Sequence, residues 1–353
     1  MPFTIVRNNI TDMSVDAIVN TANPLPVIGD GTDSAVHKKD GPQLLEERKR
    51  IGNIAVGQAV ITPAFNLDAK YVIHTTGPVW AGGNRNEETL LESCYTNSLA
   101  LAKANGCKSV AFPLISTGAY GFPKGLGLQI ATKAISQFVL TNDMMVYLVV
   151  FDKASYSLSE KLFNEIESYI DDNYVGRRIK EEYRNSMLRG RAVRSERPVL
   201  KNKPLYSRAE TPFEDYEDDE MPVLSATAFA DTDWNDMADN LGKTFSETLL
   251  ELIEQKGMTH SQAYNKANID KKHFHKIKNN RNYNPTKYTV LAFAIALELD
   301  ITQTKALMET AGLALSKSNL FDVIVSFFIE NRRYNVFELN DVLFEYDLPL
   351  LGC

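Results

Sequence analysis

Six short apolar runs alternate with helical stretches in the first half of the chain, and this alternation constrains the fold more than any other feature. Each run has the length and the branched or aromatic content of a strand. The runs are Thr4–Val6, Ala17–Asn20, Gln58–Ile61, Tyr71–His74, Val110–Leu114 and Met145–Phe151. Strands alternating with helices build layered α/β domains, because each sheet face must be covered. Residues 1–174 are therefore predicted to form an α/β domain.

The last helix of this segment has both a predicted start and a predicted apolar face. Ser157 lies three residues before Glu160, which is the spacing of a capping box. Five apolar residues then fall on one helical face: Leu162, Phe163, Ile166, Tyr169 and Ile170.

Charge divides the rest of the chain. A chain of 353 residues is too long for one ordinary core, so at least two domains are expected. Residues 177–203 carry ten Lys or Arg and three Glu, whereas residues 209–242 carry eleven acids and no Lys or Arg. Such segregated charge is typical of a solvated tether. Residues 175–242 are predicted to be a flexible linker and residues 243–353 an all-helical domain.

Composition narrows the class of protein. No apolar run is long enough to predict a transmembrane helix, and the first residues do not resemble a secretory signal. Three cysteines without metal-ligand spacing are expected to be reduced thiols in a cytoplasmic protein. His37 and His74 stand alone in sequence and are expected to be structural. Neither a metal nor a cofactor is predicted.

Two loops follow predicted strands and are candidate binding elements. "PLISTGAYGFP" (Pro113–Pro123) is a glycine-rich turn between a strand and a helix, where backbone amides can gather around a phosphate. A merely tight turn would have the same glycine spacing. "NTANPLPVIGDGTDSAVH" (Asn20–His37) offers Asn side chains suited to ribose hydroxyls. Asp33 stands at the start of the following helix, where N-capping is the commonest role of an Asp.

Together these stretches resemble a macro domain, the ADP-ribose-binding module, over residues 1–172. The matching residues are Asn20–Asn23, Ile28–Gly31, Thr32–His37, Tyr71–Trp80 and Phe112–Pro123. The resemblance implies an α/β/α three-layer sandwich that binds ADP-ribose or an ADP-ribosylated macromolecule. It implies a diphosphate loop, a ribose contact from Asn23 and Tyr120, and an adenine contact from Asn9–Ile10. The implied ligand-binding residues are Asn9, Ile10, Ala22, Asn23, Gly29, Gly31, Ser116, Thr117, Gly118, Ala119, Tyr120 and Gly121.

Three readings of this cleft remain open. The first is recognition of an ADP-ribose-type ligand. The second is ADP-ribosyl hydrolysis, for which the resemblance implies Asn23 and Asp33 as catalytic residues; an Asp near the anomeric carbon could position a water. The third is a protein-interaction module with a degenerate cleft. It stays open because Ile28 and Asp30 replace glycines and could narrow the site or repel a diphosphate, unless Asp30 points away.

The stretch Met258–Leu299 resembles the helix-turn-helix of phage-repressor-like (Xre-type) regulators. Thr259 is a helix start, Asn268 takes the turn position, and Lys271–Lys278 would be the recognition helix, with Phe274 and Ile277 inward. Basic outward residues suit phosphate contact and entry into the major groove. The predicted DNA-binding residues are Gln262, Lys271, Lys272, His275, Lys276 and Asn279. Reuse of the fold for protein contact is the alternative. The terminal helices Leu320–Ile329 and Val336–Tyr346 either pack on this fold or form a dimer seam.

Overall fold

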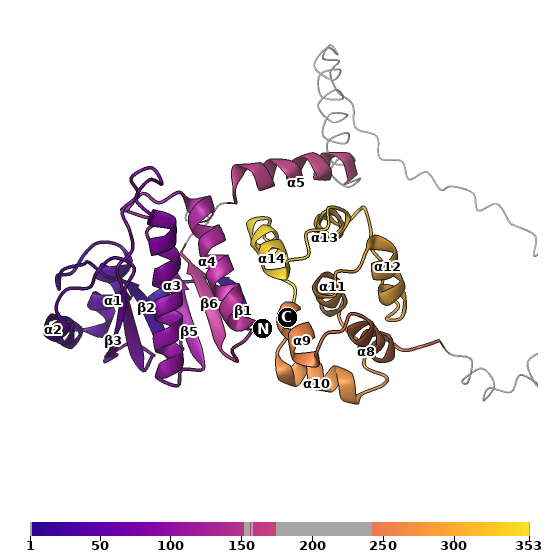
Figure 1. The fold of residues 1–353 in the computed structure, drawn as a ribbon, viewed down its shortest axis with the longest axis horizontal. Helices are drawn as coiled ribbons and strands as arrows, with labels where there is room; N and C mark the ends of the chain where they lie inside the picture. Colours follow the sequence, from indigo (N-terminus) through magenta and orange to yellow (C-terminus); the bar gives the residue numbers. More distant parts are fainter. Residues whose placement is uncertain (1, 152–155, 157, 174–241, 353) are drawn as a thin grey trace, which may run out of the picture. The chain divides into compact units, whose positions relative to one another are not determined.

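The first half of the chain is built around a six-stranded sheet, as the alternation predicted (Figure 1). The computed structural model describes residues 2–151, 156, 158–173 and 242–352. The strands are β1 (Phe3–Arg7), β2 (Ala17–Thr21), β3 (Ala59–Pro63), β4 (Tyr71–Thr75), β5 (Ser109–Pro113) and β6 (Met145–Val150). Their order is β1-β6-β5-β2-β4-β3, and only β3 is antiparallel to its neighbour. All six predicted strands are confirmed to within two residues at either end.

Helices cover both faces of the sheet, which gives the expected three layers. On one face α3 (Glu87–Ala104) and α4 (Lys124–Val139) pack against each other and against the strands. On the other face lie α1 (Thr32–Asp40), α2 (Pro42–Ile51) and a short 3-10 helix, η1 (Ile10–Asp12). Each face has its own apolar core, so the central strands are buried on both sides, as continuous apolar strands of a parallel sheet require.

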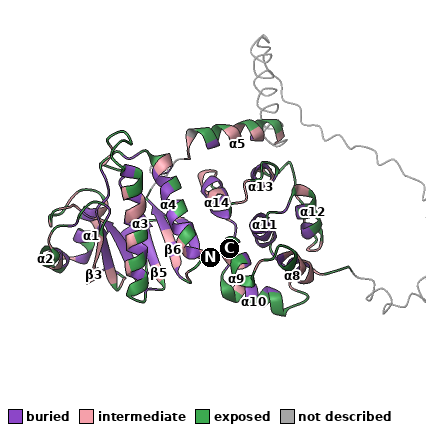
Figure 2. Cartoon of the chain, viewed as in Figure 1, coloured by how far each residue is buried: buried purple, intermediate pink, exposed green. Residues whose placement is uncertain are grey.

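The C-terminal half is helical where the structure describes it. Its helices are α8 (Phe245–Gln255), α9 (His260–Lys266), α10 (Lys271–Asn279), α11 (Lys287–Ala296), α12 (Ile301–Glu309), α13 (Leu320–Glu330) and α14 (Val336–Glu345). Each begins after a Thr, Asp or Asn whose side chain accepts a backbone amide of the first turn. Helix α11 is buried nearly all round, which fits the uniform apolarity of its sequence (Figure 2).

Four of the five residues on the predicted apolar face of α5 (Glu160–Asn173) pack against this helical core, whereas Phe163 is 38% exposed. Leu162, Ile166 and Ile170 are buried there, and α13 is the neighbouring helix. Both α13 and α14 bury apolar residues inside the same chain, which favours packing on the fold over a dimer seam. Ser157 of the predicted capping box, and the predicted linker up to residue 241, lie outside the described residues.

Residues from the two ends of the chain lie in one compact unit and contact each other directly. Asn268 has the left-handed conformation expected of the α9–α10 turn, with φ of 56°. Its side-chain oxygen accepts the Phe3 amide at 3.0 Å, and its Nδ2 donates to the Phe3 carbonyl at 2.7 Å. The turn residue thereby binds both backbone polar groups of Phe3, the first residue of the edge strand β1. Among the described residues, no helix is long and apolar enough to cross a membrane.

Candidate functional site

A cleft of about 330 Å³ opens where the parallel strands β2, β5 and β6 end. The carboxyl ends of parallel strands are the usual ligand position in open α/β sheets, because the loops there diverge. One wall is the segment after β2, and the opposite wall is the loop after β5 together with the end of β6. The lining residues are Thr21, Asn23, Gly29–Thr32, Leu114, Ser116–Tyr120 and Val149–Phe151.

Backbone hydrogen bonds shape the loop after β5. Its first turn needs a left-handed residue at Ser116, with φ of 64°. The Phe122 amide donates to the Ser116 carbonyl at 3.0 Å, and the Trp80 amide donates to the Tyr120 carbonyl at 2.9 Å. Gly77 lies so close that an added Cβ would come within 2.1 Å of the Ser116 Oγ. The loop thus depends on small residues, as its sequence indicated.

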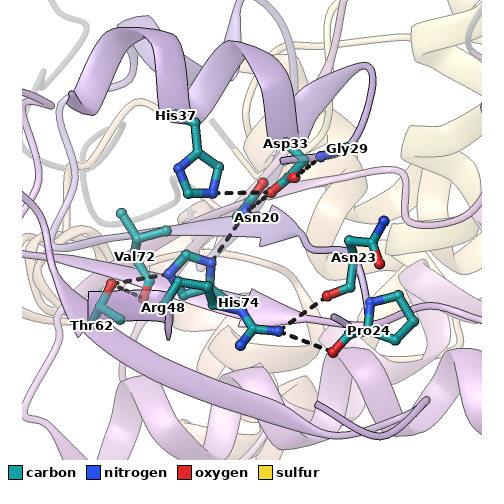
Figure 3. A network of polar contacts seen from close by, with 10 residues as sticks. All are labelled: Asn20, Asn23, Pro24, Gly29, Asp33, His37, Arg48, Thr62, Val72 and His74. Atoms are coloured by element: carbon teal, nitrogen blue, oxygen red, sulfur yellow. Dashed lines mark hydrogen bonds and ion pairs between the residues drawn. The ribbon is translucent and has the colours of Figure 1, made fainter. Parts of the chain in front are cut away.

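The opposite wall, which is the segment after β2, is held from its interior side by Asp33 (Figure 3). Only 2% of Asp33 is exposed. Its Oδ2 accepts the Gly29 amide at 2.6 Å, and its Oδ1 accepts the Asn20 Nδ2 at 2.5 Å. Helix α1 begins after Gly31, which is its N-cap residue, so the expectation that Asp33 caps the helix is wrong. A carboxylate two residues into the helix reaches back to Gly29 instead. Asp33 is absent from the residues that line the cleft.

The two histidines belong to the same buried network. His74 Nδ1 accepts from Asn20 Nδ2 at 3.2 Å, and His74 Nε2 lies 3.0 Å from Thr62 Oγ1. Because Asn20 Nδ2 is a donor, the ring must be neutral, with its proton on Nε2. Burial lowers the pKa of His74 to about 3. The Nε2 of His37 lies 3.6 Å from Asp33, and burial also lowers the pKa of His37. Both histidines are structural, as expected.

The sequence analysis did not identify Arg48, a buried cation on the interior side of the segment after β2. Its guanidinium donates to the carbonyls of Asn23 at 3.1 Å and Pro24 at 3.3 Å (Figure 3). It also donates to the carbonyl of Gly52. Only 2% of Arg48 is exposed. The signal was weak: in "LLEERKRI" Arg48 falls on the same face of α2 as Leu44, four residues earlier, among other charged residues.

Most predicted ligand-binding residues meet at the cleft. Those that line it are Asn23, Gly29, Gly31, Ser116, Thr117, Gly118, Ala119 and Tyr120. The structure does not bring Asn9, Ile10, Ala22 or Gly121 to this lining. Asn9 caps η1 by accepting the Thr11 amide, and Ile10 is buried in the core below. Ile28 is 49% exposed and outside the lining, so it does not fill the cleft, whereas the exposed Asp30 is part of the wall.

A second residue missed from the sequence is Phe151. It follows β6, lines the cleft and is 72% exposed. A large apolar ring left open to solvent at a cleft wall has a free face for a flat ligand. Its place at the end of the predicted strand Met145–Phe151 was the available indication, but periodicity alone does not distinguish a strand-end aromatic from a core residue.

The predicted DNA-contacting residues lie on the outer side of α9 and α10. Phe274 and Ile277 point inward and are buried, as predicted. The predicted set is exposed throughout: Gln262, Lys271, Lys272, His275, Lys276 and Asn279. Gln262 also completes a capping box with Thr259, so its side chain has a structural role.

The cysteines and histidines offer no metal centre in the described part of the chain, where no cluster of three suitable side chains occurs. Cys94 and Cys107 are buried free thiols, and burial raises the pKa of both. Both belong to the apolar core that α3 and α4 form with the sheet.

Comparisons with known proteins identify the class of this α/β domain. Residues 19–131 match the profile of the family described as Macro domain. The O-acetyl-ADP-ribose deacetylase of Escherichia coli (strain K12) is 45% identical over 167 residues, which is 46% of this chain and 94% of that protein. The Macro domain-containing protein TTE0995 of Caldanaerobacter subterraneus is also 45% identical, over 46% of this chain and 96% of that protein. The chain belongs to the macro domain family.

Solved structures of the same class are similar to the N-terminal half. The Oceanobacillus iheyensis macrodomain with ADP is 37% identical and covers 47% of this chain and 92% of its own, with a TM-score of 0.43. The Trypanosoma brucei macrodomain in complex with ADP-ribose is 34% identical and covers 46% of this chain and 69% of its own, with a TM-score of 0.42.

Proposed function

We propose that the cleft binds ADP-ribose, free or attached to a macromolecule. The observation that carries this is the open cleft between two loops at the ends of β2, β5 and β6, with a backbone-rich wall facing an Asn-bearing wall. Its volume of about 330 Å³ is at the lower end of small-ligand sites. An open cleft favours ligand binding over the alternative of a degenerate interaction module.

Each part of the ligand has a chemically suitable wall. The loop Ser116–Tyr120 places small residues and backbone amides where a diphosphate can approach, as glycine-rich turns do. Asn23 offers an amide to the hydroxyls of the distal ribose. The open face of Phe151 suits stacking of the adenine, because any nucleobase can stack on an aromatic side chain.

Calorimetry on the full chain tests this proposal. ADP-ribose is expected to bind with a stoichiometry of one. Gly118→Glu is expected to abolish the binding, because it places a carboxylate in the diphosphate loop. The exposed Lys103→Gln, on α3, is the matched control and is expected to change nothing. Absence of heat from the folded wild type would refute the proposal.

Hydrolysis at the distal ribose is a second candidate function. It is favoured by relatives named O-acetyl-ADP-ribose deacetylase, which are 45% identical to this chain. In this structure both oxygens of Asp33 accept hydrogen bonds inside the protein, so Asp33 would act through the loop and not on a water. Asn23, at the wall, is the residue in contact with the substrate. Release of acetate from O-acetyl-ADP-ribose, lost in Asn23→Ala, would support the activity.

For the C-terminal half we propose a helix-turn-helix that binds DNA. The favouring observation is α10, whose inner residues are buried while Lys271, Lys272 and Lys276 are exposed. Such a helix suits phosphate contact. Fluorescence anisotropy with a random-sequence duplex at low salt is the test. Lys272→Gln with Lys276→Gln should weaken binding and reduce its salt dependence, while Lys305→Gln on α12 should not. Equal effects would contradict a specific contact through α10, and absence of binding to the duplex would favour the alternative of protein contact.

A further inference from the structure

Helix α2 buries Arg48 beside Leu44, while its other side chains are exposed or partly exposed. Its neighbours Glu47, Lys49 and Arg50 reach solvent, whereas Arg48 is 2% exposed. Burial of a cation costs free energy unless its donors are satisfied. An aliphatic side chain at position 48 would avoid this cost. The hydrogen bonds of the guanidinium indicate what the buried charge does instead.

The guanidinium of Arg48 contacts one end of the loop that carries Asn23. It donates to the main-chain carbonyls of Asn23 and Pro24, and the Ile54 amide also donates to Pro24 at 2.9 Å. The loop has few donors of its own, because Pro24 and Pro26 have no amide hydrogen. A fork of fixed donors can hold two successive carbonyls at once, which a single amide cannot.

The other end of the same loop is held by the opposite charge. Asp33 binds the Gly29 amide from below, at 2.6 Å. Residues 23–29 are therefore fastened to a guanidinium at their first carbonyls and to a carboxylate at their last amide. Between these points the side-chain oxygen of Asn23 accepts the Leu25 amide at 3.1 Å. This contact makes the orientation of the Asn23 side chain depend on the backbone that Arg48 holds.

We propose that Arg48 is a positioning residue that sets the orientation of Asn23 and thereby selects ligands that carry the distal ribose. This inference rests on the proposed function. Arg48 does not touch the cleft, whose lining excludes it. Its effect should therefore be confined to the part of the ligand that Asn23 contacts, while the diphosphate loop, on the opposite wall, is unaffected.

The ratio of two affinities tests the proposal on the full chain. In Arg48→Met the affinity for ADP-ribose should fall by about tenfold, or about 1.4 kcal/mol, while the affinity for ADP, which lacks the distal ribose, should change by less than about twofold. Arg48→Lys, which keeps the charge and some donors, should recover part of the loss. The control is Arg50→Met, since Arg50 is exposed on the same helix and should leave both affinities unchanged.

Non-additivity gives a second test. If Arg48 acts through Asn23, then Arg48→Met should cost almost nothing further in an Asn23→Ala background. Equal losses for ADP and ADP-ribose, no loss for either ligand, or full additivity would each overturn the inference. In all three cases wild-type binding persists, whereas failure of the proposed function appears as wild-type protein that binds no ADP-ribose.

A readout without ligand completes the design. Amide hydrogen exchange should rise in residues 23–29 of Arg48→Met and stay unchanged in residues 114–122. Unchanged exchange in residues 23–29, or a rise in both loops, would overturn the positioning role whatever the ligand.

Discussion

The two walls of the cleft are held in opposite ways. The loop after β5 owes its shape to backbone hydrogen bonds and to the absence of a side chain at Gly77. The loop after β2 is fastened by buried polar side chains, chiefly Asp33 and Arg48. The loop after β5, here called the backbone wall, is sensitive to added side-chain volume. The loop after β2, here called the polar wall, is sensitive to protonation of its buried groups and to loss of one partner. Different substitutions should therefore disrupt the two loops, although both would contact the same ligand.

Removal of Asp33 should have the largest effect. Asp33→Ala leaves the Gly29 amide without its acceptor and removes one of the two acceptors of Asn20 Nδ2, the other being His74 Nδ1. It also leaves Arg48 without the nearby carboxylate that favours its charge. Loss of one partner from a buried charged network costs about 3–5 kcal/mol. Urea unfolding should show a drop of that order in the free energy of unfolding. Asp30→Ala, at an exposed position of the same loop, is the control; equal effects of the two substitutions would refute the account.

The second largest effect should come from acid, which lowers the free energy of unfolding through the buried histidines next to the polar wall. The pKa of His74 is about 3 in the folded protein and about 6.5 when unfolded, so the unfolded chain binds the extra proton between these values. Stability is therefore full above about pH 6.5 and is lost as the pH falls, by about 2 kcal/mol at pH 5 from His74 alone. His37, whose pKa burial also lowers, adds to the loss.

Unfolding curves measured between pH 7.5 and 5 check this dependence. His74→Gln should flatten it, while His275→Gln, at an exposed position of α10, should not. A free energy of unfolding that stays constant down to pH 5 would contradict the neutral assignment of His74.

These buried partners mark the limit of what the sequence could predict. The strands, the buried helix α11 and the glycine-rich loop follow from local patterns of apolarity and turn residues, and all are present. Arg48 could not be placed, because its partners lie about 25 residues earlier and only the tertiary fold brings them together. The pairing of Asn268 with Phe3 spans an even larger separation. The ligand contact of Asn9 stays a prediction from resemblance, and its capping of a local turn is a further role that the sequence analysis did not include.

Added side-chain volume should displace the backbone wall, which is the loop after β5. A Cβ at Gly77 would come within 2.1 Å of Ser116 and 2.8 Å of Ile115, so Gly77→Ala must displace the loop. Overpacking of this kind costs roughly 1–2 kcal/mol, and ADP and ADP-ribose should lose affinity together, unlike the selective loss in Arg48→Met. Gly242→Ala is the control, because Gly242 is exposed, lies outside the cleft lining, and a Cβ there meets no atom within 4 Å. Thermal unfolding and calorimetry measure both quantities, and a Gly77→Ala protein that binds like wild type would contradict the steric account.

The smallest effect concerns Asp30, the one charge that the polar wall exposes at the cleft lining. An exposed carboxylate several ångströms from a diphosphate repels it by only about 0.5 kcal/mol in water. Asp30→Asn should therefore raise ADP-ribose affinity about two- to threefold at about 0.02 M salt, and the gain should vanish near 0.5 M, where screening is short-ranged. A gain that persists at high salt would mean that Asp30 obstructs the cleft by its volume. Lost affinity would mean that its carboxylate binds the ligand, and the polar wall would then meet the ligand directly instead of only supporting Asn23.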